Sequence, residues 1–79
     1  MNVPTKVTEI IGRAADVAPR DLRPETQLSE LGIGSLERIE CVLSLEETFQ
    51  VEIADDDLWR IRTVQDAIEL VERFVGARN

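Results

Sequence analysis

The 79-residue chain contains no histidine and no tyrosine, and it has a single cysteine, Cys41. Without histidine it lacks the side chain that most often serves as a general base near neutral pH, so a Ser-His-Asp triad is excluded. One cysteine cannot form a disulfide within the chain, and most soft ligands of a zinc site are missing. We therefore expect no metal site, and we interpret Cys41 as a small apolar core residue.

Long apolar runs and basic residues are also scarce. No stretch is long enough to cross a bilayer, and no N-terminal segment has the length and composition of a signal peptide. Nine Lys and Arg residues stand against sixteen Asp and Glu, which gives a net charge of −7. Such a charge repels nucleic acid and anionic lipid and attracts basic protein surfaces. We expect a cytoplasmic monomer that binds no nucleic acid and does not insert into membranes.

The rest of the composition is that of one small folded domain. Hydrophobic residues make up 43% of the chain and charged residues 32%, which lies well away from the range of disordered chains. A chain of this length is too short to build two separate cores. We interpret residues 1–79 as a single domain with a core between about residues 5 and 75.

Apolar residues recur at helical spacing in the first half of the chain. The pattern predicts a helix over residues 5–16 with Thr5 as its N-terminal cap. A second helix is predicted over residues 35–50. Its expected inner face consists of Leu36, Ile39, Val42, Leu43, Leu45 and Phe49. Residues 17–34 carry proline and glycine without a period, and predict a long loop.

That long loop is expected to be anchored by its apolar residues Leu22, Leu28, Leu31 and Ile33. A long irregular loop in so small a domain is usually functional.

The second half of the chain predicts two further helices after an extended segment at residues 51–53. Asp55 is expected to cap a short third helix that places Asp56 and Asp57 in its first turn. Thr63 and Asp66 resemble a capping box at the start of a fourth helix, which ends near Gly76. No segment alternates with the period of a strand, so the predicted fold class is all-α.

Ser35 is the candidate functional residue, because it stands between Gly34 and the second predicted helix. A helix N-terminus stabilises an attached phosphate through its unpaired amides and its positive dipole end. The same serine could instead be an ordinary N-terminal cap. A hydrolase that uses Ser35 would need Lys6 as its base, because histidine is absent.

Several short segments together resemble the acyl carrier proteins of fatty acid and polyketide synthesis. The segments are residues 10–12, 28–32, 35–36, 45–47, 49, 52–53 and 63–67. Their order and spacing span nearly the whole chain. The resemblance implies a four-helix bundle, with three main helices and a short third helix.

The resemblance also implies a function that is not enzymatic. A phosphopantetheinyl transferase would move 4′-phosphopantetheine from coenzyme A onto Ser35, and the terminal thiol of the arm would carry acyl groups as thioesters. The carrier would present them to enzymes of fatty acid, polyketide or specialised lipid synthesis. Those synthase and acyl-transferring enzymes would dock through basic patches on Glu37, Glu40 and Glu47 of the second helix, unless these glutamates form only a solvated face.

The chain departs from the family at Gly34, where the family usually has aspartate. This difference favours a specialised carrier, and the alternative is an unmodified carrier-like module that only binds proteins. One physical reason for glycine there would be a positive φ.

The sequence also supports predictions for three single residues and one acidic segment. Glu46 faces the apolar side of the second helix and is expected to accept a hydrogen bond from the long loop. Trp59 is expected to be half-buried, whereas Arg38 interrupts the acidic surface of the second helix. Residues 55–57 lack the spacing of a calcium loop, so we interpret them as a site of nonspecific cation screening.

Overall fold

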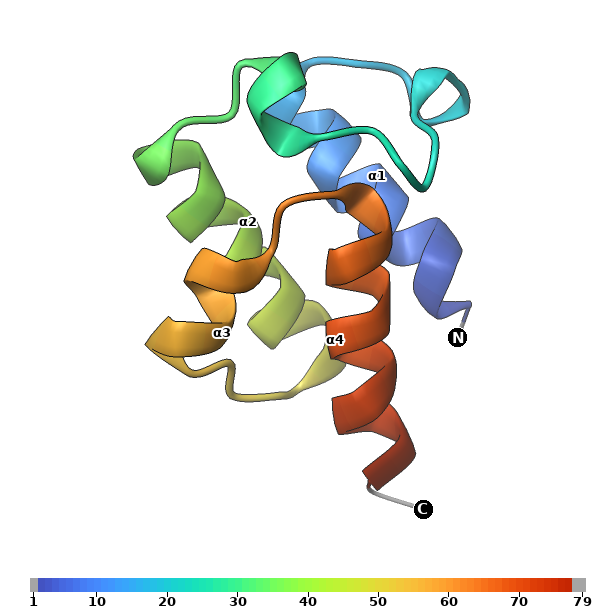
Figure 1. The fold of residues 1–79 in the computed structure, drawn as a ribbon. Helices are drawn as coiled ribbons and strands as arrows, with labels where there is room; N and C mark the ends of the chain where they lie inside the picture. The colour runs from blue at the N-terminus through green and yellow to red at the C-terminus, as the bar shows by residue number, and fades with distance from the viewer. Residues whose placement is uncertain (1, 78–79) are drawn as a thin grey trace.

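The structure is a computed structural model that describes residues 2–77 and contains four α-helices (Figure 1). The helices are α1 (Val3–Ala15), α2 (Ser35–Phe49), α3 (Asp55–Arg60) and α4 (Val64–Ala77). The predicted all-α class and the long connection between the first two helices are confirmed. Two short 3-10 turns, Pro19–Asp21 and Leu28–Leu31, lie inside that connection. Within residues 2–77 the only β pairing is an isolated bridge between Gln27 and Thr63.

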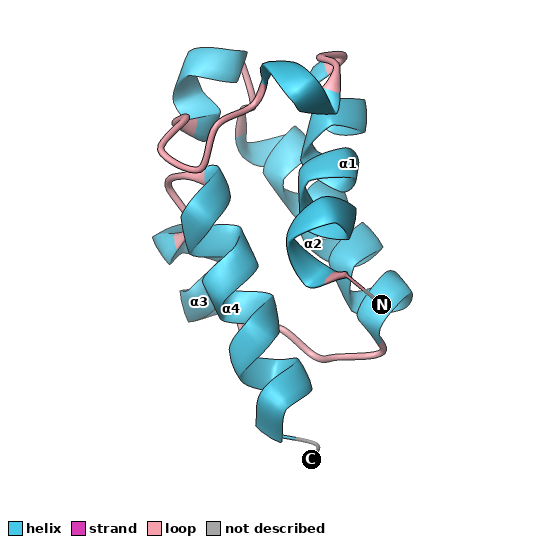
Figure 2. Cartoon of the chain, turned by 90° about the vertical axis from the view of Figure 1, so that its right-hand side faces the viewer, coloured by secondary structure: helices cyan, strands magenta, loops and turns pink. Residues whose placement is uncertain are grey.

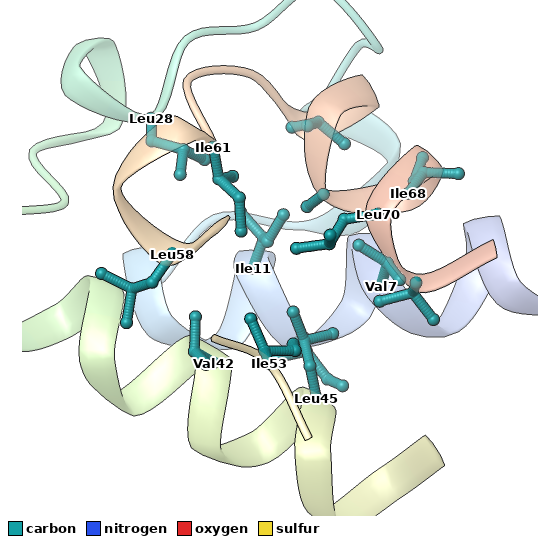
Figure 3. Close-up of a cluster of buried hydrophobic side chains, with 14 of the residues drawn as sticks. Val7, Ile11, Leu28, Val42, Leu45, Ile53, Leu58, Ile61, Ile68 and Leu70 are labelled. Atoms are coloured by element: carbon teal, nitrogen blue, oxygen red, sulfur yellow. The ribbon is translucent and has the colours of Figure 1, made fainter. Parts of the chain in front are cut away.

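Helices α1, α2 and α4 pack against one another, and α3 packs on α2 (Figures 1 and 2). Their inner faces meet in a continuous apolar core (Figure 3). The most completely buried side chains are Val7, Ile11, Leu45, Val64 and Val71. None of the helices described is long and apolar enough to span a bilayer.

The long connection is tied to this core by its own side chains, as predicted. Leu28 and Ile33 are buried, and Leu22 and Leu31 are partly buried against the core. Backbone hydrogen bonds add a second attachment, because the Leu28 amide donates to the Arg62 carbonyl at 2.9 Å. This part of the connection is therefore fixed close to the start of α4.

Gly12 lets this connection cross α1 closely. A Cβ atom at Gly12 would lie 2.6 Å from the carbonyl oxygen of Val17, which is shorter than any ordinary contact. The Val17 amide also donates to the Gly12 carbonyl at 2.8 Å. The chain can turn back over the helix here because glycine has no side chain.

Two predicted N-terminal caps are wrong, and one is confirmed. Helix α1 begins at Val3, because Asn2 Oδ1 accepts the Thr5 amide at 2.9 Å and proline suits the first turn. Residue 54 is the cap position of α3, which makes Asp55 its first helical residue. At α4 the Thr63 Oγ1 accepts the Asp66 amide and Asp66 Oδ2 accepts the Thr63 amide, both at 3.1 Å.

The predicted inner face of α2 is only half correct. Val42, Leu45 and Phe49 are buried, whereas Leu36 is 65% exposed and Leu43 58% exposed, with Ile39 exposed between them. The helix has apolar residues on two sides, and the core lies against only one of them. The second side, Leu36, Ile39 and Leu43, is called here the outer apolar face of α2.

Trp59 is 54% exposed, which fits the half-buried position expected for it. Helix α3 has six residues and directs Leu58 into the core, so the adjacent Trp59 faces outward.

Candidate functional site

Ser35 is exposed at the first residue of α2, and the backbone before it is fixed by local hydrogen bonds. Gly32 has a φ of 75° and ends the preceding turn, which brings the Ile33 amide to the Leu28 carbonyl at 3.2 Å. Burial of Ile33 anchors the chain two residues before Ser35. The hydroxyl is thus presented by a fixed turn on an accessible surface.

Gly34, not Ser35, occupies the cap position of α2, so the interpretation of Ser35 as the cap is wrong. The Gly34 carbonyl accepts the Arg38 amide at 2.9 Å, and the Gly34 amide donates to Glu37 Oε1 at 2.9 Å. Gly34 has a φ of −90°, which most residues adopt readily, so a positive φ does not explain this glycine.

The site has the features that an attached phosphate needs. The serine hydroxyl is exposed, and Gly34 places no side chain beside it. Amides in the first turn of a helix have no hydrogen-bond acceptor within the helix, and the helix dipole there favours an anion. The residues present therefore fit a phosphodiester on Ser35.

The three candidate docking glutamates have different environments. Glu40 and Glu47 are exposed on α2, close to its outer apolar face along the helix. Glu37 is half-buried, and its carboxylate is engaged at the Gly34 amide. Glu37 therefore stabilises the turn at Ser35, whereas Glu40 and Glu47 carry free surface charge.

Comparison with known proteins identifies the family of the chain. Residues 5–71 match the family described as "Phosphopantetheine attachment site". The chain belongs to this family. An acyl carrier protein of Solidesulfovibrio magneticus is 39% identical over 77 residues, which covers 96% of this chain and 99% of the relative.

A solved relative supports the fold of the carrier. The crystal structure of an acyl carrier protein from Thermotoga maritima matches with a TM-score of 0.81 and 27% identity, over 94% of this chain and 87% of that chain. The resemblance noticed in the sequence is confirmed, and so is the family's covalently attached 4′-phosphopantetheine.

Glu46 of the carrier was expected to contact the long connection, and that prediction is wrong. Its Oε2 accepts the Ile53 amide at 2.7 Å, in the segment between α2 and α3. This bond satisfies a carboxylate on the inner side of α2 and fixes the chain just before α3. The expected need for a donor was correct, but the donor comes from a different segment.

Arg38 is the residue near the site whose role the sequence did not reveal. It is half-buried, and its Nη1 donates to the Ile61 carbonyl and, at 3.3 Å, to the Leu58 carbonyl. Both acceptors lie at the C-terminal end of α3. The one available signal was its position, one helical turn after Ser35.

Cys41 of the carrier is buried, as predicted. Burial, followed by the negative charge of Glu40, raises the pKa of its thiol to about 11. Arg38 opposes this shift. The thiol is therefore protonated at neutral pH and is a poor nucleophile.

Proposed function

We propose that this carrier holds acyl groups on a 4′-phosphopantetheine arm attached to Ser35 and presents them to enzymes of fatty acid, polyketide or specialised lipid synthesis. The observation that carries the proposal is the exposed hydroxyl of Ser35 on the first residue of α2, next to a glycine. The family supplies the cofactor. We propose that the chain acts as a carrier rather than as a catalyst.

Attachment would join Ser35 Oγ to the phosphorus of coenzyme A that bears the pantetheine. The P–O bond of the pyrophosphate breaks, adenosine 3′,5′-bisphosphate leaves, and the hydroxyl proton passes to a base of the transferase. The bound arm supplies a terminal thiol for thioester chemistry. On the carrier, the fixed turn holds Ser35 in place while the first-turn amides of α2 face the new anion.

The test is loading of the purified protein with coenzyme A and a broad-specificity transferase. We expect the intact mass to increase by one phosphopantetheine, and fragmentation to place the added mass on Ser35. An unchanged mass with several transferases would instead support the unmodified interaction module.

A thiol reagent provides an independent readout of the same reaction. With a pKa of about 11, roughly one Cys41 thiol in a thousand is ionised at pH 8, and only the thiolate reacts with iodoacetamide. We expect no alkylation of the folded unloaded protein and one alkylation per loaded molecule. Rapid alkylation before loading would show that Cys41 is more accessible than its burial indicates.

We also propose that partner enzymes dock on α2, where exposed Glu40 and Glu47 accompany the outer apolar face. Leucine and isoleucine side chains at this exposure offer a contact that buries apolar area. The carboxylates would attract a basic rim on the partner. Glu37 would contribute less than predicted, because its carboxylate is already bonded to the Gly34 amide.

A double variant, Glu40→Lys with Glu47→Lys, tests this docking surface. We expect about tenfold weaker binding to a basic transferase at low salt, and a smaller dependence on salt, because exposed charge mainly governs encounter. Titration calorimetry at two salt concentrations measures both quantities. Glu69→Lys with Glu72→Lys makes the same charge change on exposed positions of α4 and serves as the control. If both double variants bind the transferase equally weakly, the loss of affinity comes from the change in net charge and not from the surface of α2.

A further inference from the structure

Arg38 is a half-buried cation without an acidic partner in the described structure. Between residues 2 and 77 the one ion pair within 4.0 Å joins Lys6 and Glu9, at 3.7 Å. The chain nevertheless has sixteen acidic residues against nine basic ones. A guanidinium that is partly removed from water and paired only with carbonyl dipoles retains an unneutralised charge.

Only one edge of this guanidinium is engaged. Both hydrogen bonds that the Arg38 side chain makes within the described residues use Nη1, with Leu58 and Ile61 as acceptors. A guanidinium carries five N–H donors in a planar fork, so donors on Nε and Nη2 remain for a second acceptor. No buried side-chain nitrogen or oxygen of residues 2–77 lacks a partner, so these donors are open to solvent or to a ligand.

The position of Arg38 points to the acceptor. Side chains three residues apart on a helix are neighbours, with Cβ atoms about 5–6 Å apart. Helical side chains generally lean towards the N-terminus of their helix, and the turn that bears Ser35 lies on that side of Arg38. An anion on Ser35 Oγ would therefore lie within reach of this long side chain. Glu37, the acidic residue of the same turn, is already bonded to the Gly34 amide.

We propose that Arg38 binds the phosphodiester of the arm through its free donors while Nη1 stays on the C-terminal end of α3. Arg38 would then connect the attached anion to α3. This inference rests on the proposed attachment at Ser35. Arginine is suited to such a contact because its fork matches phosphate oxygens and its charge does not titrate near neutral pH.

Helix α3 is the element that would respond to this contact. It has six residues, and no side chain caps its N-terminus. Its C-terminal end is held by Arg38, and the next carbonyl, that of Arg62, accepts the Leu28 amide. Immobilising the guanidinium on a phosphate would strengthen the hold on Ile61 and slow the opening of α3.

The test compares the loaded and unloaded protein in three forms: the parent, Arg38→Gln and Arg73→Gln. Arg73 is exposed on α4, so its replacement makes the same charge change away from the site. In the loaded parent we expect the ³¹P resonance of the phosphodiester to differ from that of loaded Arg38→Gln and to match that of loaded Arg73→Gln. Hydrogen exchange of α3 amides should be about fivefold slower in the loaded than in the unloaded parent, and this difference should vanish in Arg38→Gln.

Identical ³¹P shifts and identical α3 exchange in loaded parent and loaded Arg38→Gln would overturn the inference and leave the capping of α3 as the only role of Arg38. Failure of the proposed attachment would look different, because no ³¹P signal would be gained at all. If Arg38→Gln does not fold, the loaded and unloaded parent proteins still test the proposal. Hydrogen exchange of the α3 amides that is unchanged by loading would contradict it. Arg38→Lys, which keeps the charge without the fork, should retain only part of the protection.

Discussion

Replacing Ser35 with alanine is expected to abolish loading completely, because no other group could take its place in the phosphodiester at this turn. Intact mass after incubation with transferase and coenzyme A measures the result. Ser44→Ala is the matched control, since Ser44 is an exposed serine of the same helix. It should load like the parent protein. Full loading of Ser35→Ala would mean that another hydroxyl carries the arm.

The fold of Ser35→Ala should be intact. Gly34 occupies the cap position of α2, so removal of the Ser35 hydroxyl removes no cap. Alanine is the better helix former at a first helical residue, and we expect the free energy of unfolding to change by no more than about 0.5 kcal/mol. Chemical denaturation of the unloaded proteins measures this change. Loss of loading together with loss of folding would leave the assignment to Ser35 unsupported.

Gly12→Ala is expected to destabilise the protein strongly, although alanine normally stabilises a helix. The new Cβ would lie 2.6 Å from the Val17 carbonyl oxygen, and backbone on both sides must move to relieve the contact. The bond from the Val17 amide to the Gly12 carbonyl would weaken with it. We expect a loss of about 2–3 kcal/mol, or roughly 10–20 °C in Tm for a domain of this size.

Gly76→Ala is the control for that prediction. It makes the same substitution within α4, where an added Cβ would meet no atom within 4 Å. Here the ordinary helix propensity of alanine should dominate and raise stability by up to about 1 kcal/mol. Thermal unfolding of the two variants should therefore shift in opposite directions. A neutral Gly12→Ala would show that the long connection can move off α1 without cost.

The sequence predicted those features that depend on neighbouring residues. The capping pair of Thr63 and Asp66 spans four residues and was visible without any knowledge of the fold. Helical spacing of apolar residues also predicted the first helix, in which Val7 and Ile11 are buried. The true start of α1 had a local signal too, an asparagine two residues before a proline, which the prediction of Thr5 overlooked.

The sequence failed where the answer depends on contacts between distant elements. Helix α2 has apolar residues on two sides, and only the packing of the bundle decides that Val42 is buried and Leu43 exposed. The partner of Glu46 and the acceptors of Arg38 both depend on where α3 lies against α2. For the candidate site, the sequence indicated Ser35 and its place at a helix start, and attachment there remains a prediction.

The backbone conformation of Gly34 is an ordinary one, so the residue type at this position can affect recognition without affecting the fold. With a φ of −90° the position accepts most side chains, and a Cβ would meet only the flexible end of Glu37, at 3.1 Å. The residue before Ser35 can therefore be exchanged without rebuilding the turn that presents the hydroxyl. Carriers that differ at this single position could be charged selectively by different transferases in one reaction vessel, each holding its own cargo on the same scaffold.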